Sequence, residues 1–160
     1  MLKKHFYIKG ALFAALLLIF QSCSSSCRQW TYDEVCTNCP YYNSKRLVLY
    51  PDNQFRGLEL VFLRTYSGQR AYINIFSLAL PMDSNDPHKT QICISCEISS
   101  YDLYAERLEG GQRLLLSDEA AELIISNLLE CKTVTISVGR YKSEIIPRGF
   151  SEAYRNFISD

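Results

Sequence analysis

The stretch that decides the fold is LELVFLRTYSGQRAYINIFSL, residues 58–78. Its two halves, 58–66 and 70–78, are rich in β-branched and aromatic residues, which favour strands. The Ser67-Gly68 pair between them is typical of a tight turn, because glycine adopts a positive φ without strain. The sequence therefore predicts a β-hairpin over 58–78.

Further strands are predicted on both sides of this hairpin. Apolar and polar residues alternate along 92–98, so that Ile92, Ile94, Cys96 and Ile98 are expected on one apolar face. Turn residues, mostly Gly, Pro and Asn, separate the other apolar runs. These runs cover residues 46–50, 101–108, 112–116, 133–138 and 141–146.

Two helices are predicted towards the C-terminus. Ser117 or Asp118 can cap the first, over 118–129, whose apolar stripe at helical spacing comprises Ala121, Ile124, Ile125, Leu128 and Leu129. Ser151 is expected to cap the second, a short terminal helix. The predicted fold class is α+β, a mainly antiparallel sheet of about seven strands packed by one central amphipathic helix and a short C-terminal helix.

The N-terminus has the layout of an export signal. Residues 1–9 carry three lysines and no acidic residue, and residues 11–20 form an uncharged apolar run. A basic segment followed by an apolar run of this length is typical of secretory signals. The run is too short for a comfortable permanent span, which needs about 20 apolar residues.

The residues that close this run indicate lipid attachment. Phe20-Gln21-Ser22-Cys23 resembles the lipobox of bacterial lipoproteins, with Ser22 at the small position and Cys23 as the lipid acceptor. Phe20 stands where most members have leucine. The resemblance implies that residues 1–22 are a lipoprotein signal peptide, and that Cys23 carries diacylglycerol and palmitate. Several acyl chains, at about 0.8 kcal/mol per buried CH₂, give a stable membrane anchor.

The resemblance also implies a location on the extracytoplasmic face of a bacterial membrane. Residue 24 is serine rather than aspartate, which in enteric lipoproteins accompanies delivery to the outer membrane rather than the inner one. Residues 23–44 are expected to form a lipidated tether and irregular lead-in, followed by a single domain over 45–160. The alternative is ordinary signal cleavage near residues 22–26, which gives a secreted protein without lipid.

Seven cysteines in 160 residues suit an exported chain. Residues three apart in a regular strand face opposite sides, so Cys93 and Cys96 are expected to find separate partners. Cys131 is a candidate mate for Cys96, and the N-terminal segment could supply one for Cys93. If Cys23 takes lipid, the remaining disulfide candidates are Cys27, Cys36, Cys39, Cys93, Cys96 and Cys131, with 15 connectivities open.

Two C-x-x-C pairs, Cys36/Cys39 and Cys93/Cys96, allow three interpretations. A zinc site would need both pairs on tight turns with about 15–20 residues between them, far fewer than here. A thioredoxin-like site would need Cys36 at a helix N-terminus after a buried strand, whereas residues 30–35 make a poor strand. Structural disulfides are favoured, and periplasmic thiol–disulfide redox chemistry at Cys36 and Cys39 is the alternative.

Composition excludes several other functions. Without the signal's three lysines, 14 basic and 17 acidic groups remain, a formal charge of −3 with no basic stripe, so nucleic acid is not an expected partner. His88, in the polar loop 81–89, is the only histidine after the signal, which leaves no His-rich metal site. No phosphate-binding or dinucleotide-binding motif occurs. The sequence predicts no enzyme, no metal site and no cofactor.

The tyrosine content is high, with 11 in the chain. Tyr41, Tyr42, Tyr101 and Tyr104 lie in the less regular parts. Exposed tyrosines suit contacts with proteins or glycans. Ordinary packing among strands is the favoured interpretation of these four.

Four segments together resemble an uncharacterised family of small chlamydial lipoproteins: the strand around 93–96, the turn 108–113, the helix 118–129 and the hairpin-plus-helix 133–154. Residues 149–154 also look like the end of the invasion-associated locus B periplasmic family. Neither resemblance implies catalytic residues. The sequence therefore predicts a membrane-anchored lipoprotein whose disulfide-braced extracytoplasmic domain has a structural or protein-interaction role, with an unidentified protein partner.

Overall fold

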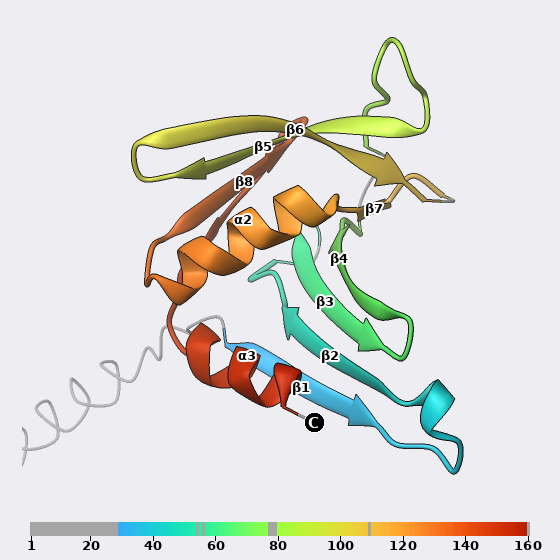
Figure 1. The fold of residues 1–160 in the computed structure, drawn as a ribbon. Coiled ribbons are helices and arrows are strands. Elements are labelled where there is room, and N and C mark those ends of the chain that lie inside the picture. The colour runs from blue at the N-terminus through green and yellow to red at the C-terminus, as the bar shows by residue number, and fades with distance from the viewer. Residues whose placement is uncertain (1–28, 54, 56, 77–79, 109, 160) are drawn as a thin grey trace, which may run out of the picture.

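Nine strands form one antiparallel sheet in the computed structural model, which describes residues 29–159 apart from 54, 56, 77–79 and 109. These described residues also form two α-helices and one short 3₁₀ helix (Figure 1). The α+β class with a mainly antiparallel sheet is confirmed, but the expected strand count of about seven is wrong. In chain order the elements are β1 (Trp30–Val35), η1 (Pro40–Tyr42), β2 (Ser44–Leu49), β3 (Glu59–Thr65), β4 (Gly68–Asn74), β5 (Lys89–Cys96), β6 (Ser99–Arg107), β7 (Arg113–Leu115), α2 (Asp118–Leu129), β8 (Val134–Val138), β9 (Tyr141–Ile145) and α3 (Phe150–Ile158).

The strands follow one another in the order β1-β2-β3-β4-β7-β6-β5-β8-β9. Strands β1 to β4 form one meander and β5 to β7 a second, because connections this short join antiparallel neighbours. The three-residue strand β7 joins the meanders by pairing with β4 on one side and β6 on the other. After α2, the β8–β9 hairpin adds to the free edge of β5.

The sheet curves around α2, and both helices lie on its concave side (Figure 1). Helix α2 packs against β4, β5 and β8, and α3 packs against β1 and β2. Alternate residues of the strands point into this space, as the two-residue period requires. The largest fully buried side chains there include Phe62, Phe150, Phe157, Leu47, Leu60, Ile73, Ile92, Ile94, Leu114, Ile124 and Leu128.

Helix α2 coincides with the predicted 118–129 segment. The Ser117 side chain accepts a hydrogen bond from the Ala120 N–H at 3.2 Å, as expected of a residue that caps a helix. Ile124 and Leu128 are fully buried, whereas Leu129, expected on the same face, is 43% exposed. The buried stripe is therefore narrower than the sequence predicted.

Strand β1 was not predicted, because residues 30–35 were assigned to the irregular lead-in. It is an edge strand in which only Trp30 is buried. Its acidic residues lie directly across from basic residues on β2. The Asp33 carboxylate is 3.1 Å from the Arg46 guanidinium, and the Glu34 carboxylate is 3.8 Å from the Lys45 ammonium. Such cross-strand pairs stabilise a sheet but leave no apolar alternation in the sequence.

Strand β5 ends earlier than predicted. Cys96 pairs with Ser99, so Glu97 and Ile98 form the two-residue turn into β6. Ile98, expected on the apolar face, is 98% exposed for this reason. Glu97 has a φ of 43°, a value that usually requires glycine.

Helix α3 also begins differently from the prediction. It starts at Phe150 after Gly149, whose φ of 76° turns the chain, and Ser151 lies within the helix rather than capping it. Phe150 and Phe157 are buried beneath α3, whereas Ile158 is 45% exposed. The Phe150 ring packs against that of Trp30, with centroids 4.8 Å apart and planes inclined by 58°, which ties this helix to β1.

Helix α2 ends on a strained residue, and this gives a stability prediction. The Lys132 N–H donates to the Asn127 carbonyl at 2.9 Å and the Cys131 N–H to the Leu128 carbonyl at 3.2 Å, the pattern of a Schellman motif. Cys131 holds the left-handed position, with a φ of 61°, where a side chain costs about 1–2 kcal/mol. In reducing buffer, Cys131→Gly is expected to raise the free energy of unfolding by ~1 kcal/mol. Urea denaturation checks this. A glycine variant no more stable than Cys131→Ala, which keeps the strain, would contradict it.

Candidate binding site at the tyrosine tip

Three exposed tyrosines gather where two strand connections meet. Tyr41 and Tyr42 belong to η1, in the connection from β1 to β2, and Tyr66 lies in the turn from β3 to β4. Their exposed fractions are 59%, 69% and 75%. We call these three residues the tyrosine tip. The expectation of ordinary packing was wrong for Tyr41 and Tyr42.

Local hydrogen bonds hold the β1–β2 connection in shape. The Asn43 side-chain oxygen accepts from the Thr37 N–H at 2.7 Å and lies 3.1 Å from the Thr37 hydroxyl. The Tyr42 N–H donates to the Cys39 carbonyl at 3.0 Å. Pro40, at the first position of η1, presets the φ that the helix needs. The backbone that carries Tyr41 and Tyr42 is therefore fixed before any ligand binds.

The three rings form one continuous surface. The Tyr41 ring centroid lies 4.9 Å from that of Tyr66, with the planes inclined by 43°. The Tyr42 ring stands edge-on to Tyr41 at 5.5 Å and 87°. Aromatic pairs in these arrangements attract one another by about 0.5–1.5 kcal/mol. The rings stabilise each other while their outer faces remain in solvent.

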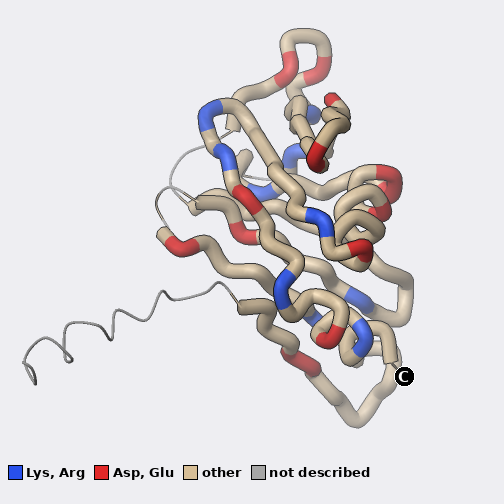
Figure 2. Tube along the Cα trace, turned by 90° about the vertical axis from the view of Figure 1, so that its left-hand side faces the viewer, with Lys and Arg blue, Asp and Glu red and all other residues tan. Residues whose placement is uncertain are grey.

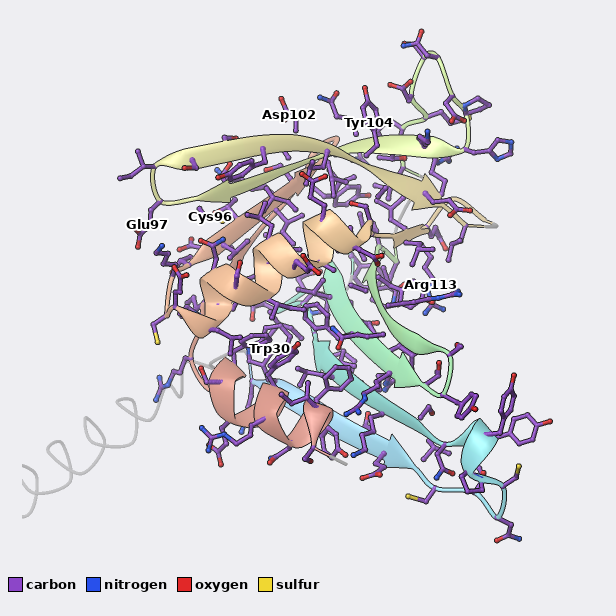
Figure 3. All side chains as sticks on the ribbon, viewed as in Figure 1. Trp30, Cys96, Glu97, Asp102, Tyr104 and Arg113 are labelled. Atoms are coloured by element: carbon purple, nitrogen blue, oxygen red, sulfur yellow. The ribbon has the colours of Figure 1, made fainter. Side chains whose placement is uncertain are left out.

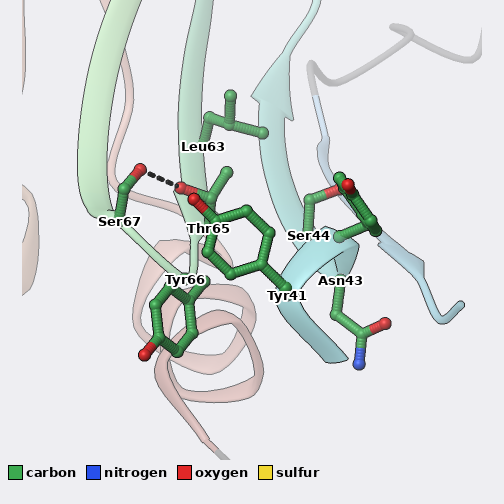
Figure 4. A pocket seen from close by; sticks show the side chains of 8 residues that line it. Tyr41, Asn43, Ser44, Leu63, Thr65, Tyr66 and Ser67 are labelled. Atoms are coloured by element: carbon green, nitrogen blue, oxygen red, sulfur yellow. Dashed lines mark hydrogen bonds between the residues drawn. The ribbon is translucent and has the colours of Figure 1, made fainter. Parts of the chain in front are cut away.

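These rings border a hollow of about 400 Å³ (Figure 4). A volume of this size falls within the ~300–1,000 Å³ typical of small-ligand sites. Besides the tyrosines, one apolar and four uncharged polar residues line it: Leu63, Asn43, Ser44, Thr65 and Ser67. The Thr65 and Ser67 hydroxyls are hydrogen-bonded to one another at 2.9 Å. The lining therefore combines aromatic faces with neutral hydrogen-bonding groups.

A second hollow, of about 260 Å³, adjoins the first and contains charge. The two share Asn43, Ser44, Thr65 and Tyr66. Lys45 donates to the Ser159 carbonyl and Arg64 to the Ile158 carbonyl, both at the C-terminal end of α3. Cations are favourable there because helix carbonyls carry partial negative charge. These two bonds fasten α3 across β2 and β3.

Tyr32 and Glu34, on β1, are coupled beside this second hollow. Burial, aided by the hydrogen bond that its hydroxyl donates to Glu34 at 2.7 Å, raises the pKa of Tyr32 to about 12. The same hydrogen bond lowers the pKa of Glu34. Because the raised pKa of Tyr32 belongs to the folded state, its contribution to stability is present below pH ~10 and is lost as the pH rises towards 12.

This coupling predicts the behaviour of a Glu34→Gln variant. Removing the carboxylate charge is expected to lower the pKa of Tyr32, yet to leave it above 10 because burial remains the larger cause. Titration of ¹³Cζ-labelled tyrosine followed by NMR measures this value. A wild-type Tyr32 that titrates near 10, or one whose pKa Glu34→Gln does not change, would contradict the prediction.

The first C-x-x-C pair lies in the same connection as Tyr41 and Tyr42. Cys36 and Cys39 are exposed free thiols in the β1–β2 connection. Cys36 follows the exposed end of edge strand β1, and Cys39 precedes a 3₁₀ helix of only three residues. A thioredoxin-like nucleophile would instead lie at the N-terminus of an α-helix after a buried strand. The geometry does not supply the helix dipole that lowers a thiol pKa.

The second pair behaves as the alternation predicted. Cys96 is buried in the core with Ile92 and Ile94, while the Cys93 sulfur lies 3.2 Å from the Ser100 hydroxyl on the opposite face. Burial raises the pKa of the Cys96 thiol. Cys131 is exposed after α2. All five cysteines in the described part of the chain are unpaired, so the disulfides stay a prediction, and Cys23 and Cys27 lie outside it.

The structure also bears on metal binding and on the distribution of charge. Four strands separate β2 from β5 in the sheet, and the two C-x-x-C pairs lie at opposite ends of the molecule, so they cannot share a zinc ion (Figure 1). Within residues 29–159, less the six undescribed positions, no three His, Cys, Asp or Glu side chains form a group that could hold a metal. Lys, Arg, Asp and Glu are interspersed along the chain (Figure 2). His88 is exposed in its loop.

Tyr101 and Tyr104 lie on β6, away from the tyrosine tip. They are 43% and 50% exposed, so packing does not account for them either. Tyr104 points outward beside Asp102, away from α2 (Figure 3). Tyr66, by contrast, was missed as a site residue because it ended a predicted strand. Its position next to the Ser67-Gly68 turn was the only signal that it could lie at a loop.

Comparisons of the chain with known proteins identify no related protein. No protein-family model matches the chain. Neither the curated proteins nor the solved structures contain a significant match. In the part of the chain that the structure describes, none of the helices has the length and apolar character to span a membrane.

Proposed function

We propose that this protein is a bacterial lipoprotein, anchored through acylated Cys23, whose folded part is a non-catalytic binding module. Its contact surface is the tyrosine tip. A basic and apolar N-terminus followed by Ser22-Cys23 supports the anchor. The proposed location is the extracytoplasmic face of the outer membrane.

One observation carries the assignment of a binding role: three tyrosines, with the Tyr41 ring in contact with both others, are more than half exposed around one hollow. Exposing aromatic surface to water is unfavourable unless a partner covers it. Tyrosine also supplies a large contact area with few rotatable bonds, so little conformational entropy is lost on binding. Both properties are those of a contact surface.

The direction of β1 fits this arrangement. The strand begins at Trp30, seven positions after Cys23, and runs towards the connection that holds Tyr41 and Tyr42 (Figure 1). Six residues, five steps of about 3.3 Å, place the end of β1 ~17 Å from its start. An anchor before β1 would therefore leave the tyrosine tip at the far end of the strand, where it can reach a partner.

Fatty-acid labelling in a bacterial host that processes lipoproteins tests the anchor. Cells that express the full chain are fed an alkyne-tagged palmitate, and the purified protein is coupled to a fluorescent azide. Wild type and Cys27→Ala are expected to carry label, whereas Cys23→Ala is expected to carry none. Equal labelling of Cys23→Ala and wild type, or an unlabelled wild type, would contradict the proposal.

A thiol–disulfide enzyme is the second candidate, because Cys36 and Cys39 are both exposed on one connection. The rate of alkylation by iodoacetamide across pH 5–9 separates the two roles. A binding module predicts that both thiols, once reduced, are alkylated at pH 5–6 no faster than the cysteine of an unstructured peptide. Fast alkylation of Cys36 at pH 5–6 would favour the enzyme.

A further inference from the structure

We infer that the tyrosine tip binds a neutral sugar ring of a glycan. This inference rests on the proposed function, since it names the ligand of the same contact surface. Aromatic faces carry negative charge in their π systems, and the C–H groups on one face of a sugar ring carry partial positive charge. Tyr66 and Tyr42, 75% and 69% exposed, offer such faces beside the hollow.

The ring spacing favours a sugar over a proline-rich peptide. A polyproline II helix repeats every three residues, about 9 Å, and docks in grooves between aromatic side chains. The tyrosine rings touch one another, with centroids 4.9 Å and 5.5 Å apart, so no proline can enter between them. They form one angled cluster rather than a row of slots, with the Tyr41 and Tyr66 planes inclined by 43°. A sugar ring can therefore stack on the exposed outer face of a single tyrosine, such as Tyr66.

The polar groups of the hollow match the hydroxyls of a sugar. Asn43 uses its side-chain oxygen to accept from Thr37, so its amide NH₂ is the end that can donate to a ligand. The Ser67 hydroxyl, paired with Thr65, retains acceptor capacity. Each sugar hydroxyl both donates and accepts hydrogen bonds. Uncharged protein donors and acceptors together can therefore satisfy the sugar hydroxyls when the face of the sugar ring is buried.

The charge of the site indicates a neutral ligand. None of the eight residues that line the larger hollow carries a formal charge. The cations of the adjoining hollow, Lys45 and Arg64, donate to carbonyls at the end of α3. A glycan with a carboxylate or phosphate would place its negative charge at a hollow that no Lys or Arg lines. The expected sugar is therefore an uncharged hexose or N-acetylhexosamine.

Titration with defined oligosaccharides tests the inference. The full-length protein is solubilised in lauryldimethylamine oxide, which has no sugar headgroup, and titrated with hexasaccharides of α- and β-linked glucose, mannose, galactose and N-acetylglucosamine. Saturation-transfer NMR identifies a binder and calorimetry gives its Kd. At least one is expected to bind, and Tyr66→Ala is expected to weaken it roughly tenfold through the lost ring contact.

Tyr104→Ala is the matched control, since Tyr104 is an exposed tyrosine on β6 outside the tyrosine tip. It is expected to leave the Kd unchanged, and circular dichroism confirms that both variants fold. Binding by none of the hexasaccharides, or equal weakening in the two variants, overturns the inference. Decaproline bound at the tip in place of any sugar also overturns it while leaving the proposed contact surface intact. Labelling of Cys23 is independent of all these outcomes.

Discussion

Phe150→Ala is expected to lower the free energy of unfolding by ~3–5 kcal/mol. Phe150 is fully buried at the start of α3, with ring centroids 4.8 Å from Trp30 and 6.2 Å from Phe62. It therefore joins α3, β1 and β3 in one aromatic cluster. Alanine would remove these contacts and leave a cavity that the surrounding strands can fill only in part. A domain of this size is stabilised by about 5–15 kcal/mol in total, so the loss is a large share of it.

Urea unfolding followed by Trp30 fluorescence measures this loss, since Trp30 is the chain's single tryptophan and lies beside Phe150. Phe55→Ala provides the matched control, because Phe55 is 75% exposed. That variant is expected to stay within about 0.5 kcal/mol of wild type. A Phe150→Ala variant as stable as Phe55→Ala would show that α3 does not pack on β1 as described.

Leu128→Ala, in α2, is expected to cost ~2–5 kcal/mol. Leu128 is fully buried on the face that packs into the concave side of the sheet. The adjacent Leu129 is 43% exposed, so Leu129→Ala is the matched control for Leu128→Ala. Both changes alter helix propensity equally. The difference between them therefore isolates the burial of one side chain.

The same urea experiment gives the result. Leu129→Ala is expected to change the free energy of unfolding by less than about 1 kcal/mol, leaving a gap of at least ~1 kcal/mol between the variants. A reversed order, with Leu129→Ala the less stable of the two, would mean that α2 is rotated about its axis relative to the structure.

Much of the fold could be predicted because strong local patterns coincide with tertiary packing. The β3–β4 hairpin follows from two apolar runs about a glycine-containing turn. Helix α2 follows from a capping serine and an apolar stripe, and its observed bounds are the predicted ones. The opposite orientation of Cys93 and Cys96 follows from the period of a strand.

The misses have a common physical cause, since each depends on residues distant in sequence. Strand β1 is held by Asp33 and Glu34 opposite Arg46 and Lys45, and neither partner can be identified before the register is known. Ile98 continued a perfect alternation, yet the chain turns there at the cost of a positive φ at Glu97. Local propensity cannot show where the partner strand ends.

The candidate site was predictable only in part. Tyr41 and Tyr42 were recognised as tyrosines outside regular structure, but packing was the favoured interpretation. Tyr66 joins them only because the β1–β2 and β3–β4 connections meet at one end of the sheet. A cluster built from two connections 24 residues apart becomes visible once the strand order is known.

The intact mass of the mature native protein tests the central claim most directly, because the proposed anchor would determine where the tyrosine tip is displayed. The protein is purified from membranes of a host that processes lipoproteins, and the N-terminal peptide is sequenced by mass spectrometry. The account predicts a chain that begins at Cys23 and carries a diacylglyceryl group on its sulfur. A chain that begins at another residue, or at Cys23 without fatty acid, would contradict it.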